Sequence, residues 1–160
     1  KYIADRMMQS GGVLLGGEES GGIGYGTHIP ERDGLLSALY VLEAIAASGK
    51  DLSELYQDLQ KRTGFFSAYD RIDLTLSSDA TKQKLIQELT QSPPTDLLGM
   101  AVSDVSNPDG FKIRLQEGSW VLIRFSGTEP VLRLYCEAAT DERVSQLLAW
   151  AKQWALSHEA

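Results

Sequence analysis

Glycine is concentrated at the start of this chain, and this limits what the first part can fold into. Nine of the 15 glycines lie among the first 34 residues. Because glycine lacks a Cβ and adopts backbone conformations closed to other residues, so dense a segment is expected to consist mostly of turns and loops. The exception is the apolar run at residues 13–15, which stands between glycine pairs and predicts a short buried strand of the parallel-sheet type.

Composition and charge exclude several classes of protein. The chain has 160 residues, of which 42% are hydrophobic and 23% are charged, as in ordinary globular domains. Its net charge of −7 disfavours nucleic acid and anionic membrane surfaces as partners, so a bound anion must be held by a local site. The single cysteine, Cys136, allows no internal disulfide, and no run approaches the roughly 20 apolar residues of a membrane span. We therefore expect a cytoplasmic protein, and the first residue, Lys1 rather than methionine, predicts a piece of a longer chain.

Two helices are predicted after the glycine-rich segment. Asp33 precedes apolar residues at three- and four-residue spacing and Gly49 follows them as a C-terminal cap, which predicts a well-buried helix. Asp51 and Glu54 match a capping box that begins a second helix, and Gly64 ends it. With the strand before them, these helices predict an α/β fragment over residues 1–64.

Beyond residue 64 the pattern is that of a second module. Alternating or continuous apolar runs predict strands at residues 72–76, 100–105, 111–115, 120–123 and 131–136. Helical spacing predicts one helix over residues 82–91 and another after Thr140. The order favours an α+β domain over residues 65–160, with a mainly antiparallel sheet of four to five strands and helices on one face.

One candidate site is the loop at residues 16–22, of sequence GGEESGG. Its glycines allow the backbone to approach a ligand closely, and carboxylates beside a hydroxyl suit the vicinal hydroxyl groups of a sugar. Taken alone, this loop is more often an acidic solvated turn. The sequence around Ser20 matches neither a nucleophile elbow nor a phosphate-binding P-loop, which disfavours a serine hydrolase and a nucleotide-binding protein.

The other candidate site is the segment at residues 124–130, RFSGTEP, between two apolar strands. Arg124 can bind phosphate oxygens through two parallel hydrogen bonds, Ser126 and Thr128 offer hydroxyl donors, and Gly127 lets backbone N–H groups turn toward an anion. A plain hairpin turn does not need arginine, serine and threonine at this spacing. The segment therefore predicts a phosphate-binding loop.

Together the two loops resemble those of the phosphohexomutases, the phosphoglucomutase and phosphomannomutase superfamily. In that family a Gly-Glu-x-Ser-Gly loop of the third domain contacts sugar hydroxyls, and an Arg-x-Ser-Gly-Thr-Glu-Pro loop of the fourth domain holds the substrate phosphate. The resemblance implies that the sugar is bound by Glu18, Ser20 and Gly21. It implies that the phosphate is bound by Arg124, Ser126, Gly127 and Thr128.

The resemblance also implies what this chain lacks. Many members have histidine where this chain has Gly22. The family's phosphoserine loop and magnesium loop have no counterpart in these 160 residues, so the chain resembles the end of domain 3 plus domain 4, with no catalytic and no metal-binding residue of its own.

By this resemblance the intact enzyme would be an isomerase that interconverts hexose 6-phosphate and hexose 1-phosphate, through a phosphoserine and a bisphosphorylated sugar. Its cofactors would be Mg²⁺ and a hexose 1,6-bisphosphate. The partners expected for this chain are sugar phosphates and the N-terminal domains of the same polypeptide, and the chain alone is expected to be inactive. Glucose, mannose and glucosamine phosphates remain equal alternatives as substrates.

Two other functions remain open from the residues alone. One is a free-standing phosphate or sugar-phosphate binding module without catalysis. The other is a structural α+β domain whose polar loops bind nothing.

Overall fold

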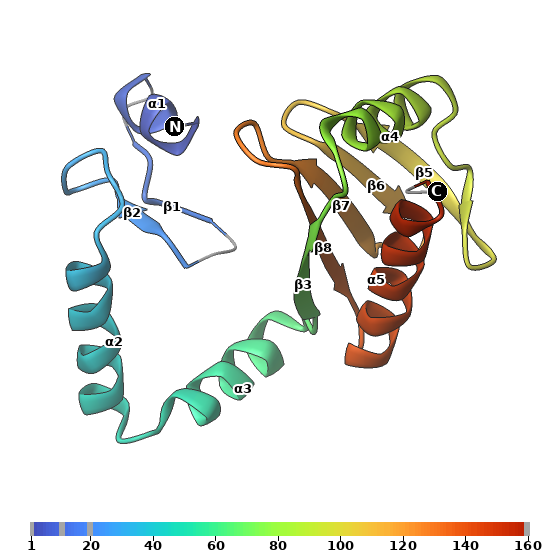
Figure 1. Cartoon of the computed structure of the whole chain (residues 1–160). Helices are drawn as coiled ribbons and strands as arrows, with labels where there is room; N and C mark the ends of the chain where they lie inside the picture. The colour runs from blue at the N-terminus through green and yellow to red at the C-terminus, as the bar shows by residue number, and fades with distance from the viewer. Residues whose placement is uncertain (1, 10–11, 19–20, 159–160) are drawn as a thin grey trace. The chain divides into compact units, whose positions relative to one another are not determined.

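The computed structural model describes residues 2–9, 12–18 and 21–158, and the chain divides into two compact units, Lys1–Gly64 and Phe65–Ala160 (Figure 1). The elements of the first unit are α1 (Tyr2–Gln9), β1 (Leu15–Gly17), β2 (Ile23–Tyr25), α2 (Gly34–Ser48) and α3 (Leu52–Thr63). Those of the second unit are β3 (Ala68–Thr75), α4 (Asp79–Gln91), β4 (Asp96–Leu97), β5 (Met100–Ser106), β6 (Phe111–Leu115), β7 (Trp120–Phe125), β8 (Val131–Ala138) and α5 (Asp141–Leu156). The prediction of an α/β region followed by an α+β region is confirmed.

The first strand differs from its prediction. Strand β1 begins at Leu15 and runs antiparallel to β2, and Leu14 is 81% exposed, so the buried parallel strand predicted at residues 13–15 is wrong. Within the described ranges β1 pairs with β2 alone, so it belongs to a two-stranded antiparallel hairpin and not to a parallel sheet. Helix α1 is also new, because the glycine content of this segment predicted turns, whereas residues 2–9 contain no glycine.

The ends of helices α2 and α3 agree with the predictions from the sequence, but the predicted burial does not. The Asp33 carboxylate accepts from Leu36 N–H at the start of α2, and the predicted capping box of Asp51 and Glu54 begins α3. Gly49 and Gly64 end the two helices in left-handed conformations.

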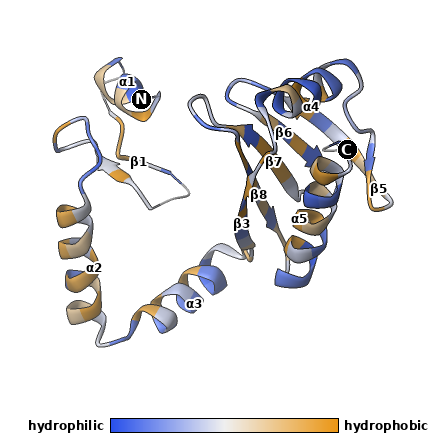
Figure 2. Ribbon diagram, viewed as in Figure 1, coloured by the Kyte–Doolittle hydropathy of each residue, from blue (hydrophilic) through white to orange (hydrophobic). Residues whose placement is uncertain are grey.

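The well-buried helix predicted between Asp33 and Gly49 is wrong, because no residue of α2 is buried and Leu35 is 83% exposed. Figure 2 shows α2 apolar along its length. A periodic apolar pattern indicates a helix face that packs against other residues, and the described part of the first unit contains no residues that bury this face.

The second unit is built on one antiparallel sheet in the order β3-β8-β7-β6-β5-β4. It has six strands rather than the four to five predicted, because β4 has two residues, too few for an alternating pattern to reveal. The hairpins β5–β6 and β7–β8 place polar turns between apolar strands, as the sequence indicated.

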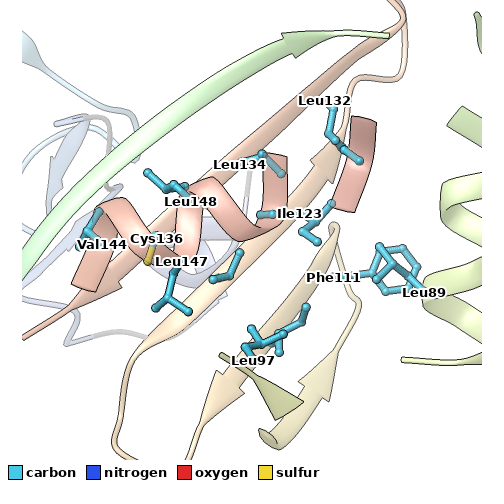
Figure 3. Packing of buried hydrophobic residues seen from close by; sticks show 14 of the residues in the cluster. Leu89, Leu97, Phe111, Ile123, Leu132, Leu134, Cys136, Val144, Leu147 and Leu148 are labelled. Atoms are coloured by element: carbon cyan, nitrogen blue, oxygen red, sulfur yellow. The ribbon is translucent and has the colours of Figure 1, made fainter. Parts of the chain in front are cut away.

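One face of this sheet carries the core. Helices α4 and α5 contribute apolar side chains to a single cluster with alternate residues of the strands (Figure 3). From the helices the cluster includes Leu85, Leu89, Val144, Leu147, Leu148, Ala151 and Ala155. From the strands it includes Leu97, Phe111, Ile113, Leu115, Val121, Ile123, Leu132, Leu134, Cys136 and Ala138. The predicted arrangement of helices on one face is therefore confirmed. By alternation along the strands, Arg114, Arg124 and Arg133 belong to the opposite face of the sheet.

Cys136 lies within this cluster, and its burial predicts low reactivity. Burial raises the pKa of the Cys136 thiol from 9.0 to about 12. Because the thiolate is the nucleophile, a rise of that size lowers the reactive fraction near pH 8 by about a thousandfold. We expect iodoacetamide to modify Cys136 very slowly in the folded chain and at an ordinary rate in urea, measured by mass spectrometry.

An exposed thiol introduced by Gln83→Cys on α4 provides an internal reference in the same chain. Equal modification rates of the two thiols under native conditions would show that the core around Cys136 opens readily.

Candidate functional site

The two candidate loops fall in different units, so each is described within its own unit. The predicted phosphate-binding residues lie at the end of β7 and in the loop 126–130 that joins β7 to β8. The predicted sugar-binding residues Glu18 and Gly21 lie between β1 and β2. The third predicted sugar-binding residue, Ser20, lies outside the described residues.

Backbone hydrogen bonds fix both ends of the loop 126–130. At its start, Ser126 N–H donates to the Val131 carbonyl at 2.9 Å, which closes the β7–β8 hairpin. At its end, Leu76 N–H donates to the Pro130 carbonyl at 2.7 Å, which ties the loop to the segment after β3. The loop is therefore held by β8 and by the segment after β3, while residues 127–130 themselves are exposed.

Two arginines occupy directly opposite positions on β7 and β8, next to this loop. The pairing register places Arg124 opposite Arg133. Opposite residues of an antiparallel pair have Cβ atoms about 4.5–5.5 Å apart, and like charges in such positions destabilise a sheet. The arrangement therefore costs stability unless a negative charge accompanies it.

The negative charges nearby are only partly available to these arginines. Arg124 Nη2 lies 3.1 Å from Asp109 Oδ2, in an ion pair whose side chains are 42% and 53% exposed. Asp73 is opposite Arg133 on β3, but its carboxylate lies 3.2 Å from Arg71 Nε. Within the described part of the chain, the buried Nε of Arg133 has no hydrogen-bond partner. An anion bound here would supply both an acceptor and a compensating charge.

Arg133 is a candidate site residue that the sequence analysis missed. The alternation along residues 131–136 placed it away from the core layer but gave it no role. The available signal was the hairpin itself, because pairing the strands on either side of the loop brings residues 124 and 133 face to face.

Among the described residues, the hydroxyl groups of Ser126 and Thr128 make no hydrogen bond outside the loop, so both can donate to a ligand. The Ser126 Oγ accepts from Thr128 N–H at 3.4 Å, a long contact. Gly127 does not adopt a left-handed conformation, and a Cβ built there meets nothing within 4 Å. Its contribution is thus open space beside the backbone, which lets a ligand come close.

Two backbone hydrogen bonds join the described ends of the first loop. Glu18 N–H donates to the Gly22 carbonyl at 2.9 Å, and Gly21 N–H donates to the Glu18 carbonyl at 3.0 Å, with a φ of 88° at Gly21. The Glu18 carboxylate is directed to Arg32, whose Nη1 lies 2.8 Å from Glu18 Oε2. This hydrogen bond raises the pKa of Arg32.

The contact between Glu18 and Arg32 depends on Gly22. A Cβ at residue 22 would lie 2.6 Å from Arg32 Cδ and 3.1 Å from Glu18 Oε2. The space that a side chain would fill is therefore occupied by the arginine. A pocket of about 260 Å³ lies beside this pair and is lined by Ile3, Ala4, Met7, Glu18, Pro30, Glu31 and Arg32.

The neighbouring polar residues have structural roles. Asp33 caps α2 and also lies 2.9 Å from His28 Nε2, and the Leu36 N–H and His28 together lower the pKa of the Asp33 carboxyl. Arg32 N–H and its side chain hydrogen-bond to Glu31, which lowers the pKa of that carboxyl. His28 thus orients a helix cap in this structure.

No three His, Cys, Asp or Glu side chains among the described residues are grouped so that they could hold a metal ion. None of the described helices is long and apolar enough to cross a membrane.

Comparison with known families confirms the family resemblance seen in the sequence. Residues 1–63 match the model described as phosphoglucomutase/phosphomannomutase, alpha/beta/alpha domain III, and residues 77–150 match the model described as phosphoglucomutase/phosphomannomutase, C-terminal domain. The chain belongs to the phosphoglucomutase/phosphomannomutase family.

Individual relatives have names from the same family. The chain is 29% identical over 146 residues to a phosphoglucomutase/phosphomannomutase of Thermococcus kodakarensis, covering 91% of this chain and 29% of that protein. It is 32% identical over 153 residues to a phosphoglucosamine mutase of Geobacter metallireducens, covering 96% of this chain and 28% of that protein. The crystal structure of a phosphoglucomutase/phosphomannomutase family protein from Burkholderia thailandensis has a TM-score of 0.68 and 25% identity, covering 98% of this chain and 30% of that one. The chain thus spans less than a third of these relatives.

The substitution Gly22→Ala tests the contact between Glu18 and Arg32. The new Cβ should displace the Arg32 side chain and separate it from Glu18, with little change in melting temperature because the pair is partly exposed. The side-chain Nε–Hε signal of Arg32 in an NMR spectrum reports the contact.

Glu18→Gln should move the same signal, whereas Gly34→Ala should leave it in place, since a Cβ at Gly34 meets nothing. An Arg32 signal unchanged by Gly22→Ala would mean that the arginine is not held where the structure places it.

Proposed function

We propose that this chain is the substrate-binding portion of a phosphohexomutase that interconverts hexose 6-phosphate and hexose 1-phosphate by phosphoryl transfer through a phosphoserine and a bisphosphorylated sugar. In this proposal Arg124, Ser126, Gly127 and Thr128 bind the phosphate that is not being transferred, together with Arg133. The chain supplies binding and positioning, and the reacting serine belongs to another part of the enzyme.

The observation that carries the proposal is the pair of opposed arginines beside the loop. Arg124 and Arg133 are cross-strand partners on β7 and β8, and their side chains extend from the same face of the sheet. The buried Nε of Arg133 has no hydrogen-bond partner in the described chain. Guanidinium groups match the geometry of phosphate oxygens, and hydrogen bonds to charged groups contribute roughly 1.5–3 kcal/mol each. A few such bonds offset the repulsion of a phosphate by a chain whose net charge is −7.

The exposed apolar helices favour a portion of a larger enzyme over a free-standing binding module. Leu35, Leu39 and Leu42 on α2 are 83%, 62% and 60% exposed, and Leu52, Tyr56 and Leu59 on α3 are each more than half exposed. Isolated soluble domains rarely expose so much contiguous apolar surface. We infer that further domains of the same polypeptide cover α2 and α3, which is the partner the sequence analysis expected.

For the sugar, the proposal assigns hydroxyl recognition to Glu18, Ser20 and Gly21. The Glu18 carboxylate is an acceptor held by Arg32, and the neighbouring pocket has room for part of a hexose ring. Mg²⁺ and a hexose 1,6-bisphosphate are the cofactors proposed for the intact enzyme. We assign the metal site to another part of the intact enzyme, because no three His, Cys, Asp or Glu side chains are grouped among the described residues.

The proposal is tested by titrating the ¹⁵N-labelled chain with glucose 1-phosphate and glucose 6-phosphate. We expect amide shifts centred on residues 124–128, at millimolar ligand or below. Arg124→Ala and Arg133→Ala should each weaken binding by about tenfold or more, because each removes a charge-assisted hydrogen bond.

Arg114→Ala is the matched control. Arg114 lies on the same face of the sheet, but its guanidinium is paired with Asp104 and Ser106, so its loss should leave binding unchanged. Absence of any shift in residues 124–128 would count against the phosphate site. Binding by a full-length polypeptide that fails to interconvert the two glucose phosphates would instead favour the binding module.

A further inference from the structure

A lysine on α4 contacts the backbone of the phosphate-binding loop from the helix side of the sheet. Lys82 Nζ donates a hydrogen bond to the Ser126 carbonyl at 2.6 Å, across 44 residues of sequence, in a part-buried position. Lys82 is one turn before Leu85, which packs in the core, so it lies on the sheet-facing side of α4. The contact adds a third anchor to a loop that is already tied at Ser126 N–H and at the Pro130 carbonyl.

The effect of this anchor follows from the geometry of the peptide bond. The Ser126 carbonyl and the Gly127 N–H belong to the same peptide unit, and no peptide bond described here is cis. In a planar trans peptide the C=O and the N–H point in opposite directions. Holding the Ser126 carbonyl toward α4 therefore turns the Gly127 N–H away from α4.

The side away from α4 is where the two arginines lie. Helix α4 packs on the face of the sheet formed by Ile123, Leu132 and their apolar neighbours. Arg124 and Arg133 alternate with those residues along β7 and β8, so they belong to the opposite face. The Gly127 N–H, which has no acceptor among the described residues, is thereby directed toward the arginine side.

We propose that Lys82 is a positioning residue of the phosphate site, which orients the Gly127 amide toward an anion held by Arg124 and Arg133. This inference rests on the proposed function for the identity of the anion as a phosphate group. Lys82 itself does not contact that anion. It acts through the peptide unit between Ser126 and Gly127.

The place of Lys82 on its helix supports a role of this kind. Ser78 caps α4, so Lys82 lies at the end of the first helical turn, near the positive end of the helix dipole. A cation is disfavoured there, and an exposed polar residue would serve the helix better. The Ser126 carbonyl gives the ammonium group a compensating acceptor.

The experiment compares Lys82→Met, Lys82→Arg and Lys84→Met in the ¹³C,¹⁵N-labelled 160-residue chain without ligand. Lys84 lies on the same helix, is exposed and makes no hydrogen bond or ion pair with the described residues, so it controls for loss of one charge from α4. We expect Lys82→Met to move the NMR signals of the Ser126 carbonyl carbon and the Gly127 amide nitrogen, and Lys84→Met to leave both signals unchanged. In Lys82→Arg both signals should lie close to their wild-type positions. Amide signals of core residues confirm that each variant is folded.

The second arm titrates the same proteins with inorganic phosphate. Lys82→Met should weaken binding by about tenfold, Lys82→Arg should recover most of it, and Lys84→Met should match the wild type. A purely structural role would lower the melting temperature of Lys82→Met without moving the Gly127 signal or the phosphate affinity, and would overturn the inference.

Failure of this inference is distinguishable from failure of the proposed function. Wild-type binding at residues 124–128 with unchanged Gly127 signals in Lys82→Met would overturn the role of Lys82 and leave the proposed function standing. A wild-type loop that binds neither inorganic phosphate nor glucose 1-phosphate would contradict the proposed function. In that case the Ser126 and Gly127 signals without ligand decide whether Lys82 orients the peptide unit between these residues. Signals that are unchanged in Lys82→Met would overturn the role of Lys82.

Discussion

The pairing register of β7 with β8 is the constraint on which the second unit depends. Because side chains alternate between the two faces, the register that opposes Phe125 to Leu132 also opposes Arg124 to Arg133. A slip of one residue would take Leu132, Leu134 and Cys136 out of the core and carry the arginine into it. Burial of the core face therefore fixes the polar face at the same time, and the opposed arginines are held in place by the packing of α4 and α5 against the other side of the sheet.

In the first unit, by contrast, the helix ends are well defined by local interactions, but the apolar side chains of the helices are not buried. Caps at Asp33 and Asp51 and left-handed glycines at Gly49 and Gly64 define α2 and α3 fully. These interactions are local, so they need no partner layer. Burial is a property of what lies next to a helix, and the exposed leucines of α2 mark a face prepared for a layer that the described residues do not contain.

The sequence predicted those features whose causes are short in range. Helix ends, the alternation of β8 and the polar hairpin loop follow from residues within a few positions of one another. The antiparallel pairing of β1, the exposure of α2 and the sixth strand could not be predicted, because each depends on neighbours that periodicity does not identify. In the candidate site, Arg124 is part of a sequence motif and could be predicted. Arg133 is identified only by the pairing register of β7 with β8, and Lys82 only by its contact with Ser126, 44 residues away in sequence.

The resulting division of labour suits the proposed ligand. Arg124 and Arg133 come from paired strands, so the sheet fixes the backbone positions from which both charges extend. Residues 127–130 of the loop are exposed, and the loop is tied at its ends and through Lys82. Charge and backbone N–H groups recognise a phosphate without reading the sugar attached to it. A mutase must accept a hexose phosphate at either end of the sugar, and a site that reads only the phosphate accepts both. In the proposed function, contact with the sugar hydroxyls then falls to the first unit, where Gly22 gives Arg32 the space to hold Glu18.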